Sequence, residues 1–282
     1  MSMEQLRNYL QASKARKDVS VRDAAQISNR LHEVFDRMAM QSAMKGQAKP
    51  LHTGFADIDE IIGGLELGEL VAFDGAPGSG RTAMMLNVAI EAARETQLPI
   101  LIYSQVHSAQ QITRRLLSML TGVRISAIES ADLTDAEWNM LSTASIWLKE
   151  KDILITDLDQ SIPELCASIN RCDTPALVIV DGLPADALEA DQMKLLKNLA
   201  QKKNCCVLFS GSYLENQPYI SGEVDKVFFI EGYYQNETVL EIRWNRTGKN
   251  GGTLLLWYPP CLQYLPFTPK NIDEDDESGC VG

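Results

Sequence analysis

The sequence predicts an α/β fold built on a mostly parallel sheet with helices on both faces. Three observations lead to this prediction: short apolar runs alternate with helical patterns from Leu51 onward, a glycine-rich loop separates one such run from a helix, and the last three runs follow one another directly. Alternating strands and helices are typical of parallel sheets, whereas consecutive strands indicate an antiparallel edge. With no internal repeat and no long linker, we expect one domain over residues 51–268, after a segment 1–50 and before a disordered acidic tail 269–282.

Each expected strand is a short apolar run, and each expected helix repeats its apolar residues at three- and four-residue spacing. The expected strands cover, in chain order, residues 69–74, 100–104, 153–157, 177–181, 205–210, 226–231, 238–244 and 253–258. The expected helices cover residues 82–95, 109–120, 135–149, 163–170 and 189–202.

A further amphipathic helix is expected before this domain. Ser20 and Asp23 resemble a capping box, and apolar residues then recur on one helical face to about Met44. The run from Gly46 to Pro50 ends the helix. The apolar face of this helix must be buried against another surface. Two alternatives remain open: the helix packs on its own domain, or it packs on a neighbouring subunit. The apolar face consists of Val21, Ala24, Ile27, Leu31, Val34 and Met38.

Charge and composition restrict the function. The formal net charge is −12, and leaving out the five acidic residues 273–277 still gives about −7. Strong DNA binding needs excess Lys and Arg to neutralise phosphates, so this balance argues against it. The six cysteines and three histidines are scattered, which predicts reduced thiols and no zinc site. No segment reads as a membrane span or a secretory signal, so we expect a cytoplasmic protein.

The glycine-rich loop has the pattern of a phosphate-binding loop. It runs G-A-P-G-S-G-R-T from Gly75 to Thr82, directly after a strand and before a helix. Glycines let backbone amides turn toward a phosphate at the positive end of the helix, and Thr82 offers a hydroxyl to Mg²⁺. Arg81 replaces the usual lysine, and its larger planar guanidinium does not reproduce the lysine's alignment. The candidate nucleotide-binding residues are Gly75, Pro77, Gly78, Ser79, Gly80, Arg81 and Thr82.

A second nucleotide motif follows at the right place in the chain. The apolar strand 177–180 ends in Asp181, an acid that can hold Mg²⁺ through water. Many buried strands end in Asp for turn reasons, so the loop is what strengthens this assignment. Together, the two motifs predict ATP and Mg²⁺ as candidate ligands, with Thr82 and Asp181 on the metal.

At this point the ordered motifs resemble the C-terminal, RecA-like P-loop ATPase domain of DnaB-type replicative helicases. Residues 53–59 (T-G-F-A-D-I-D) and 64–70 (G-L-E-L-G-E-L) resemble the family's T-G-F-x-x-L-D and G-L-x-x-G-D-L. Trp138 falls where the family has a D-W pair, and residues 241–248 resemble E-I-I-x-K-x-R-N-G. The resemblance covers about residues 20–267 and makes the first helix similar to the family's linker helix, which packs on the adjacent subunit of a ring.

The departures from the family concern catalysis. Residues 103–108 (Y-S-Q-V-H-S) match F-S-L-E-M-S, which puts Val106 where the family has its catalytic glutamate. Valine cannot accept a proton, and the adjacent Gln105 is expected to point to the other face of the strand. The family's sensor glutamine corresponds to Gly211, and its lysine before the arginine finger to Trp244. Arg246 keeps the finger position and is the second candidate catalytic residue with Asp181.

The stretches that supply DNA-contacting loops in the family are short here. Little remains between Pro184 and the helix near Glu189, and the family's arginine-rich run is reduced to residues 215–223 (E-N-Q-P-Y-I-S-G-E). A channel without basic loops has little with which to hold phosphates. We therefore expect single-stranded DNA binding to be weak or absent.

Three functions are compatible with these residues. The first is a catalytically degenerate helicase homologue that acts through protein contacts, with a DnaB-type ring or with itself. The second is a divergent but active ATP-dependent DNA helicase, which would rely on Arg81, Thr82, Asp181 and Arg246. The third is a sensor module that binds ATP as a structural ligand without hydrolysis.

Overall fold

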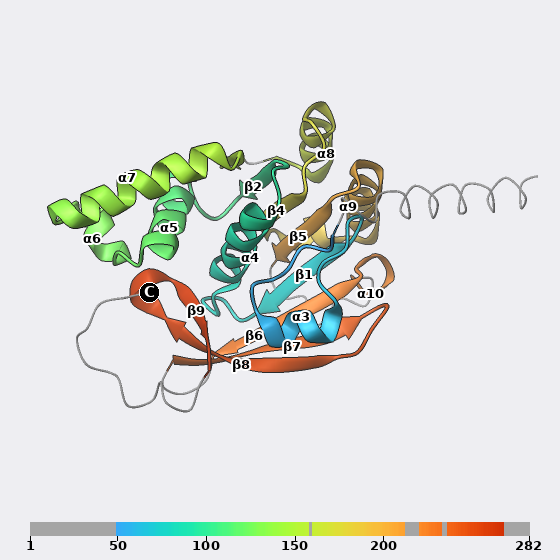
Figure 1. Cartoon of the computed structure of the whole chain (residues 1–282). Coiled ribbons are helices and arrows are strands. Elements are labelled where there is room, and N and C mark those ends of the chain that lie inside the picture. The colour runs from blue at the N-terminus through green and yellow to red at the C-terminus, as the bar shows by residue number, and fades with distance from the viewer. Residues whose placement is uncertain (1–48, 158–159, 212–219, 233–235, 268–282) are drawn as a thin grey trace, which may run out of the picture. The chain divides into compact units, whose positions relative to one another are not determined.

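The computed structural model describes residues 49–157, 160–211, 220–232 and 236–267 of the 282-residue chain (Figure 1). The chain separates into two units at Lys49 and Pro50. The helix expected over residues 20–44 and the acidic tail lie outside the described residues. The predicted division into three segments therefore stays a prediction.

One mixed sheet forms the centre of the described region, with strand order β3-β2-β4-β5-β1-β6-β7-β8-β9. The six strands from β3 to β6 pair in parallel, and the remaining pairs are antiparallel. The strands are β1 (Leu70–Gly75), β2 (Ile100–Ser104), β3 (Ile153–Thr156), β4 (Leu177–Leu183), β5 (Cys206–Gly211), β6 (Lys226–Gly232), β7 (Glu237–Asn245), β8 (Gly251–Tyr258) and β9 (Gln263–Pro266).

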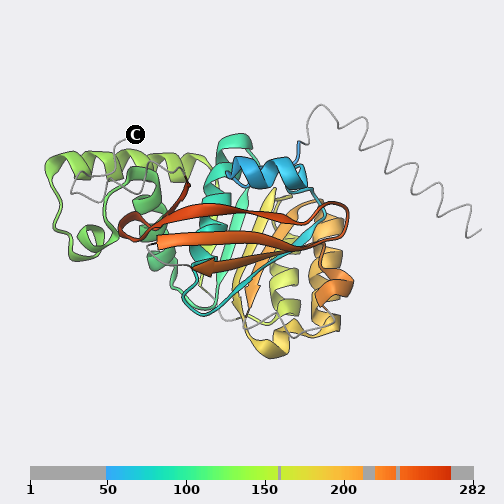
Figure 2. The ribbon, with the colours of Figure 1, turned by 90° about the horizontal axis from the view of Figure 1, so that it is seen from below.

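The predicted antiparallel edge is confirmed, but it begins one strand later than its three consecutive runs indicate. Strand β6 pairs in parallel with β1, and only β7, β8 and β9 reverse direction. These strands form the orange-to-red end of the sheet (Figure 2). Strand β9 was not predicted; it pairs with β8 after a short 3-10 turn, Pro259–Cys261.

The five predicted helices are present within one or two residues of their expected ends. Helices α5, α7 and α8 each begin with a capping box, in which the N-cap hydroxyl and a Glu or Gln three residues later satisfy backbone amides. Three short helices lacked a sufficient pattern to be predicted: α3, α6 and α10. The helices are α3 (Ala56–Ile62), α4 (Arg81–Glu95), α5 (Ala109–Thr121), α6 (Ile125–Ser130), α7 (Asp135–Glu150), α8 (Ile162–Arg171), α9 (Ala190–Lys203) and α10 (Ile220–Glu223).

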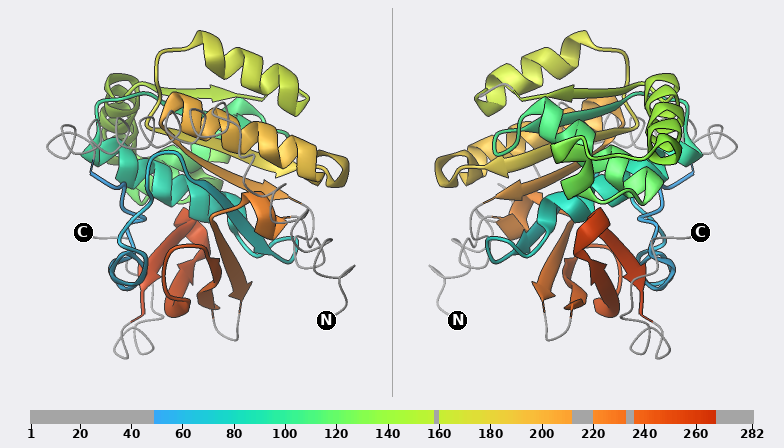
Figure 3. Two further views of the ribbon diagram at one scale, coloured as in Figure 1. Left: turned by 90° about the vertical axis from the view of Figure 1, so that its right-hand side faces the viewer. Right: turned by 90° about the vertical axis from the view of Figure 1, so that its left-hand side faces the viewer.

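Both faces of the parallel sheet are buried, by different helices. On one face, Phe73, Ile102 and Ile179 pack in a core with α4 and α5. On the other face, Ala72 and Val180 pack in a second core with α8 and α9. Figure 3 shows these helix layers on opposite sides of the sheet. Consecutive residues of a strand point to opposite faces of the sheet, so alternate side chains pack in the two cores.

The cysteines of the described region are not paired with one another. Cys166, Cys172, Cys205, Cys206 and Cys261 are free thiols, and Cys280 lies outside the described residues. Burial raises the pKa of Cys166 to about 11, which makes its thiolate scarce at neutral pH. In the described part of the chain, no cluster of His, Cys, Asp or Glu side chains is built to hold a metal ion. None of the helices described there is long and apolar enough to cross a membrane.

Candidate nucleotide site

The phosphate loop leaves the end of β1 and enters the first turn of α4. Gly75, Gly78 and Gly80 all have positive φ, at 146°, 84° and 92°, which side chains rarely tolerate. A Cβ at Gly75 would lie 2.5 Å from both the Ile230 carbonyl oxygen and the Ser79 hydroxyl. The glycines therefore permit a compact backbone turn whose amides are available at the N-terminus of a long helix.

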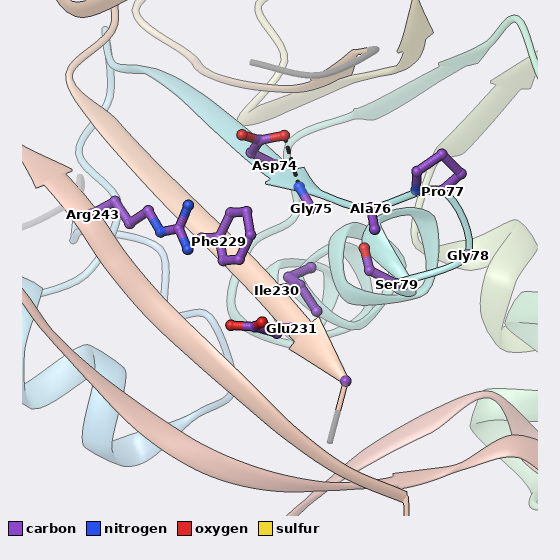
Figure 4. A pocket seen from close by; sticks show the side chains of 11 residues that line it. Asp74, Gly75, Ala76, Pro77, Gly78, Ser79, Phe229, Ile230, Glu231 and Arg243 are labelled. Carbon is purple, nitrogen blue, oxygen red and sulfur yellow. Dashed lines mark hydrogen bonds between the residues drawn. The ribbon is translucent and has the colours of Figure 1, made fainter. Parts of the chain in front are cut away.

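A cavity of about 530 Å³ lies against this loop. One wall is residues 74–79, and the opposite wall is Phe229 to Gly232 of β6 with Arg243 of β7. Figure 4 shows Arg243 beside the Phe229 ring, and the guanidinium carbon lies 3.1 Å from the ring centroid. The Ser79 hydroxyl is buried without a hydrogen-bond partner. A glycine cradle, a helix N-terminus and an unsatisfied buried hydroxyl fit a phosphate group.

A tyrosine from the C-terminal end of the sheet supports the loop. Tyr264 of β9 is 5% exposed, and its hydroxyl donates a 3.0 Å hydrogen bond to the Ser79 carbonyl. Its ring packs on Trp257 with centroids 4.6 Å apart. A Cβ at Gly80 would overlap the Tyr264 hydroxyl oxygen. Glycine at position 80 is thus required both by its φ and by the close approach of this ring.

Arg81 is hydrogen-bonded outside the phosphate loop. Its Nη1 donates a hydrogen bond to the Gly211 carbonyl at the end of β5. Arg81 and Gly211 are separated by 130 positions in the chain. In the resemblance described above, Arg81 stands at the position of the family's lysine and Gly211 at that of its sensor glutamine. The two departures are therefore in contact with each other.

Thr82 and Asp181 are brought together as the motifs predict. The Thr82 hydroxyl lies 3.0 Å from both carboxylate oxygens of Asp181. Ser104 and Ser210 donate to the same carboxylate at 3.1 Å and 2.8 Å. Asp181 is 2% exposed, so these three hydroxyls provide the partners that a buried carboxylate needs. Thr82 and Asp181 offer hard oxygen ligands beside the phosphate loop, a donor set that fits Mg²⁺.

No acid occupies the position from which the family's glutamate would act. Val106 is 56% exposed, and a Cβ at Gly182 would lie 2.6 Å from its methyl group, so the valine covers the glycine. The side-chain amide of the adjacent Gln105 donates to the Gln160 carbonyl at 2.9 Å. The expectation that Gln105 and Val106 point to opposite faces of a strand does not apply, because β2 ends at Ser104 and both residues lie in the bend that follows.

His107, a titratable residue, directly follows Val106 in the chain. Its pKa is lowered by burial and by the nearby Arg115 cation, although Asp181 partly opposes this effect. Because the folded state disfavours protonated His107, its contribution to stability is full above pH 6.5 and falls as pH drops below that value. We expect the His107→Asn variant to lose less stability than the parent chain between pH 7.5 and pH 5, as measured by urea unfolding. Equal pH dependence in both proteins would contradict this assignment.

Arg246 follows β7 and lies near the N-terminal end of β1, whereas the phosphate loop follows the C-terminal end of that strand. Its Nε is 3.2 Å from Asp225 Oδ1, and its Nη2 donates to the Gly222 carbonyl at 2.8 Å. Asp225 in turn accepts from the Leu70 amide, at the start of β1. The phosphate loop follows the other end of β1, which spans about 17 Å, so Arg246 and the loop lie toward opposite ends of this strand.

Several residues of the site carried no sequence signal. Tyr264 and the cavity residues Phe229 and Glu231 belong to strands without a recognisable motif, and Arg243 lies within the 241–248 motif but was not singled out. Ser104 and Ser210 could have been found, because each lies at or next to the end of a strand that flanks β4, which carries Asp181.

Comparison with known proteins identifies the family. The family model for the DnaB-like helicase C-terminal domain matches residues 50–210, more than half of the chain. A probable replicative DNA helicase of Guillardia theta is 33% identical over 105 residues, 37% of this chain and 18% of that protein. Replicative DNA helicase DnaB of Geobacillus stearothermophilus is 26% identical over 161 residues, 56% of this chain and 36% of that protein. The chain thus matches only a minor part of each relative's length.

Solved structures agree on the fold. A solved ATPase domain superposes with a TM-score of 0.70 at 18% identity, covering 86% of this chain and 99% of that one. A DnaB-like replicative helicase, studied for its interactions with primase, gives a TM-score of 0.68 at 17% identity and covers 94% of this chain and 77% of that one. The sheet and its helix layers are therefore those of RecA-like ATPase domains. The chain belongs to the DnaB-like helicase C-terminal domain family.

Proposed function

We propose that this chain is a DnaB-type helicase homologue in DNA replication that does not hydrolyse ATP and acts through protein contacts, with a helicase ring or with further copies of itself. The observation that carries the proposal is the site around Asp181: the loop, the hydroxyls and the carboxylate are retained, while the base position is a valine packed on Gly182. Hydrolysis needs a group that orients and deprotonates the attacking water. The cytoplasm is the location that this function implies.

Two further features support a role without DNA translocation. The net charge of −12 opposes binding to a polyanion. Helix α7 exposes Trp138, Met140 and Ile146 at 51%, 44% and 60%. Large exposed apolar side chains on one helix favour a protein partner over a nucleic acid.

Association is the direct test. The purified chain is analysed by size-exclusion chromatography with light scattering, alone and mixed with a DnaB-type helicase ring. We expect a complex in one of these two conditions. The Trp138→Ser, Ile146→Ser double variant should weaken it at least tenfold, whereas Leu98→Ser, which replaces a 47% exposed residue outside α7, should not. A chain that stays monomeric and binds no ring would contradict the proposal.

A second candidate is a sensor that binds ATP with Mg²⁺ as a structural ligand. The buried, unpartnered Ser79 hydroxyl in the retained glycine loop favours it. A ligand that binds only the native state raises stability, so MgATP would raise Tm without being consumed. The active-helicase alternative instead requires turnover.

A further inference from the structure

The first two residues of α4 are attached to the ends of two neighbouring strands. Thr82 donates to Asp181 of β4, and Arg81 donates to the carbonyl of Gly211, the last residue of β5. The residue before Gly211, Ser210, donates to the same Asp181 carboxylate at 2.8 Å. Arg81 therefore meets an acceptor whose position is fixed by its own strand and by Asp181.

Gly211 is also held in place by packing. A Cβ there would lie 3.0 Å and 3.1 Å from the Leu188 methyl groups and 3.2 Å from the Leu183 carbonyl. Leu188 is fully buried, so it has little room to move aside. Position 211 thus favours glycine, and its carbonyl stays within reach of the guanidinium.

We propose that the Arg81–Gly211 hydrogen bond is an autoinhibitory latch that holds the loop's only cation away from an incoming phosphate. The guanidinium has further N–H donors, but a nucleotide can draw the whole group onto its phosphates only after this bond is broken. A hydrogen bond from a charged group contributes enough to change a binding constant by about 10- to 100-fold. Lysine at position 81, one bond shorter and with a compact ammonium, loses the reach to the carbonyl and faces the phosphates as a point charge.

This inference rests on the proposed function, because it concerns the affinity of the same site in a chain that does not hydrolyse ATP. The test is calorimetric titration of MgATP into the full chain, its Arg81→Lys variant and an Arg94→Lys control. Arg94 lies on the same helix, and its guanidinium forms an exposed ion pair with Glu91. Thermal unfolding establishes that both variants are folded.

The latch predicts a Kd for MgATP at least tenfold lower in Arg81→Lys than in the parent chain and unchanged in Arg94→Lys. If the parent chain shows no detectable binding of MgATP and Arg81→Lys binds it measurably, this outcome also supports the latch. Equal or weaker binding by Arg81→Lys, including no binding by either protein, overturns the latch. ATP turnover by the parent chain would instead overturn the proposed function, so the two failures are distinguishable.

Discussion

The Gly80→Ala substitution is expected to lower the free energy of unfolding by about 2–5 kcal/mol relative to the parent chain. Its methyl group would occupy a backbone with φ of 92°, which costs about 1–2 kcal/mol for a non-glycine residue. It would also overlap the buried Tyr264 hydroxyl, and overpacking adds about 1–3 kcal/mol. Urea unfolding followed by circular dichroism measures the difference.

Gly78→Ala is the matched control for this prediction. Its φ is 84°, but a Cβ there has nothing within 4 Å, so only the backbone strain of about 1–2 kcal/mol is expected. Adding Tyr264→Phe to Gly80→Ala removes the overlapping oxygen and should recover part of the loss. Equal losses for Gly78→Ala and Gly80→Ala would mean that Tyr264 does not hold the loop.

The Lys226→Ala variant is expected to lose about 3–5 kcal/mol of stability. Lys226 is 1% exposed and pairs with Glu69, which is 7% exposed, so the change leaves a buried carboxylate without its cation. For a domain of this size, the loss corresponds to a Tm about 10 °C lower. Calorimetry measures this shift.

Lys194→Ala is the control, because Lys194 is exposed on the neighbouring helix α9 and should change stability by less than about 0.5 kcal/mol. The pKa of Glu69 is already raised by burial, against the opposing effect of Lys226. Removing Lys226 raises this pKa further, so protonation relieves the variant and its deficit should shrink as pH falls. A deficit that is small, or unchanged with pH, would contradict a buried charge pair.

Local patterns were sufficient to predict the elements that place the loop and Asp181. The strand–loop–helix order around Gly75 and the apolar run before Asp181 each lie within one short segment. Parallel pairing then brings Thr82 to Asp181, because the carboxyl ends of neighbouring parallel strands meet at one edge. The roles of these residues in binding and catalysis stay predictions.

The contacts that tune the site could not be predicted in this way. Tyr264 reaches the loop from a strand 185 positions away, and Arg81 reaches Gly211 across 130 positions. The periodicity of apolar residues predicts single helices and strands, but it does not predict which distant residues come into contact. These contacts depend on the order of the strands in the folded sheet. The short helix α3 lacked a signal for a different reason: its N-cap, Phe55, makes no side-chain capping bond.

Steady-state ATP hydrolysis by the purified chain, with and without single-stranded DNA, tests the central claim most directly. The Asp181→Asn variant is the control, since it keeps the shape of the side chain but removes its charge. We expect the parent chain to show no turnover above this control in either condition. DNA-stimulated turnover that disappears in Asp181→Asn would show that another group replaces the missing base at Val106, and the chain would then be a motor.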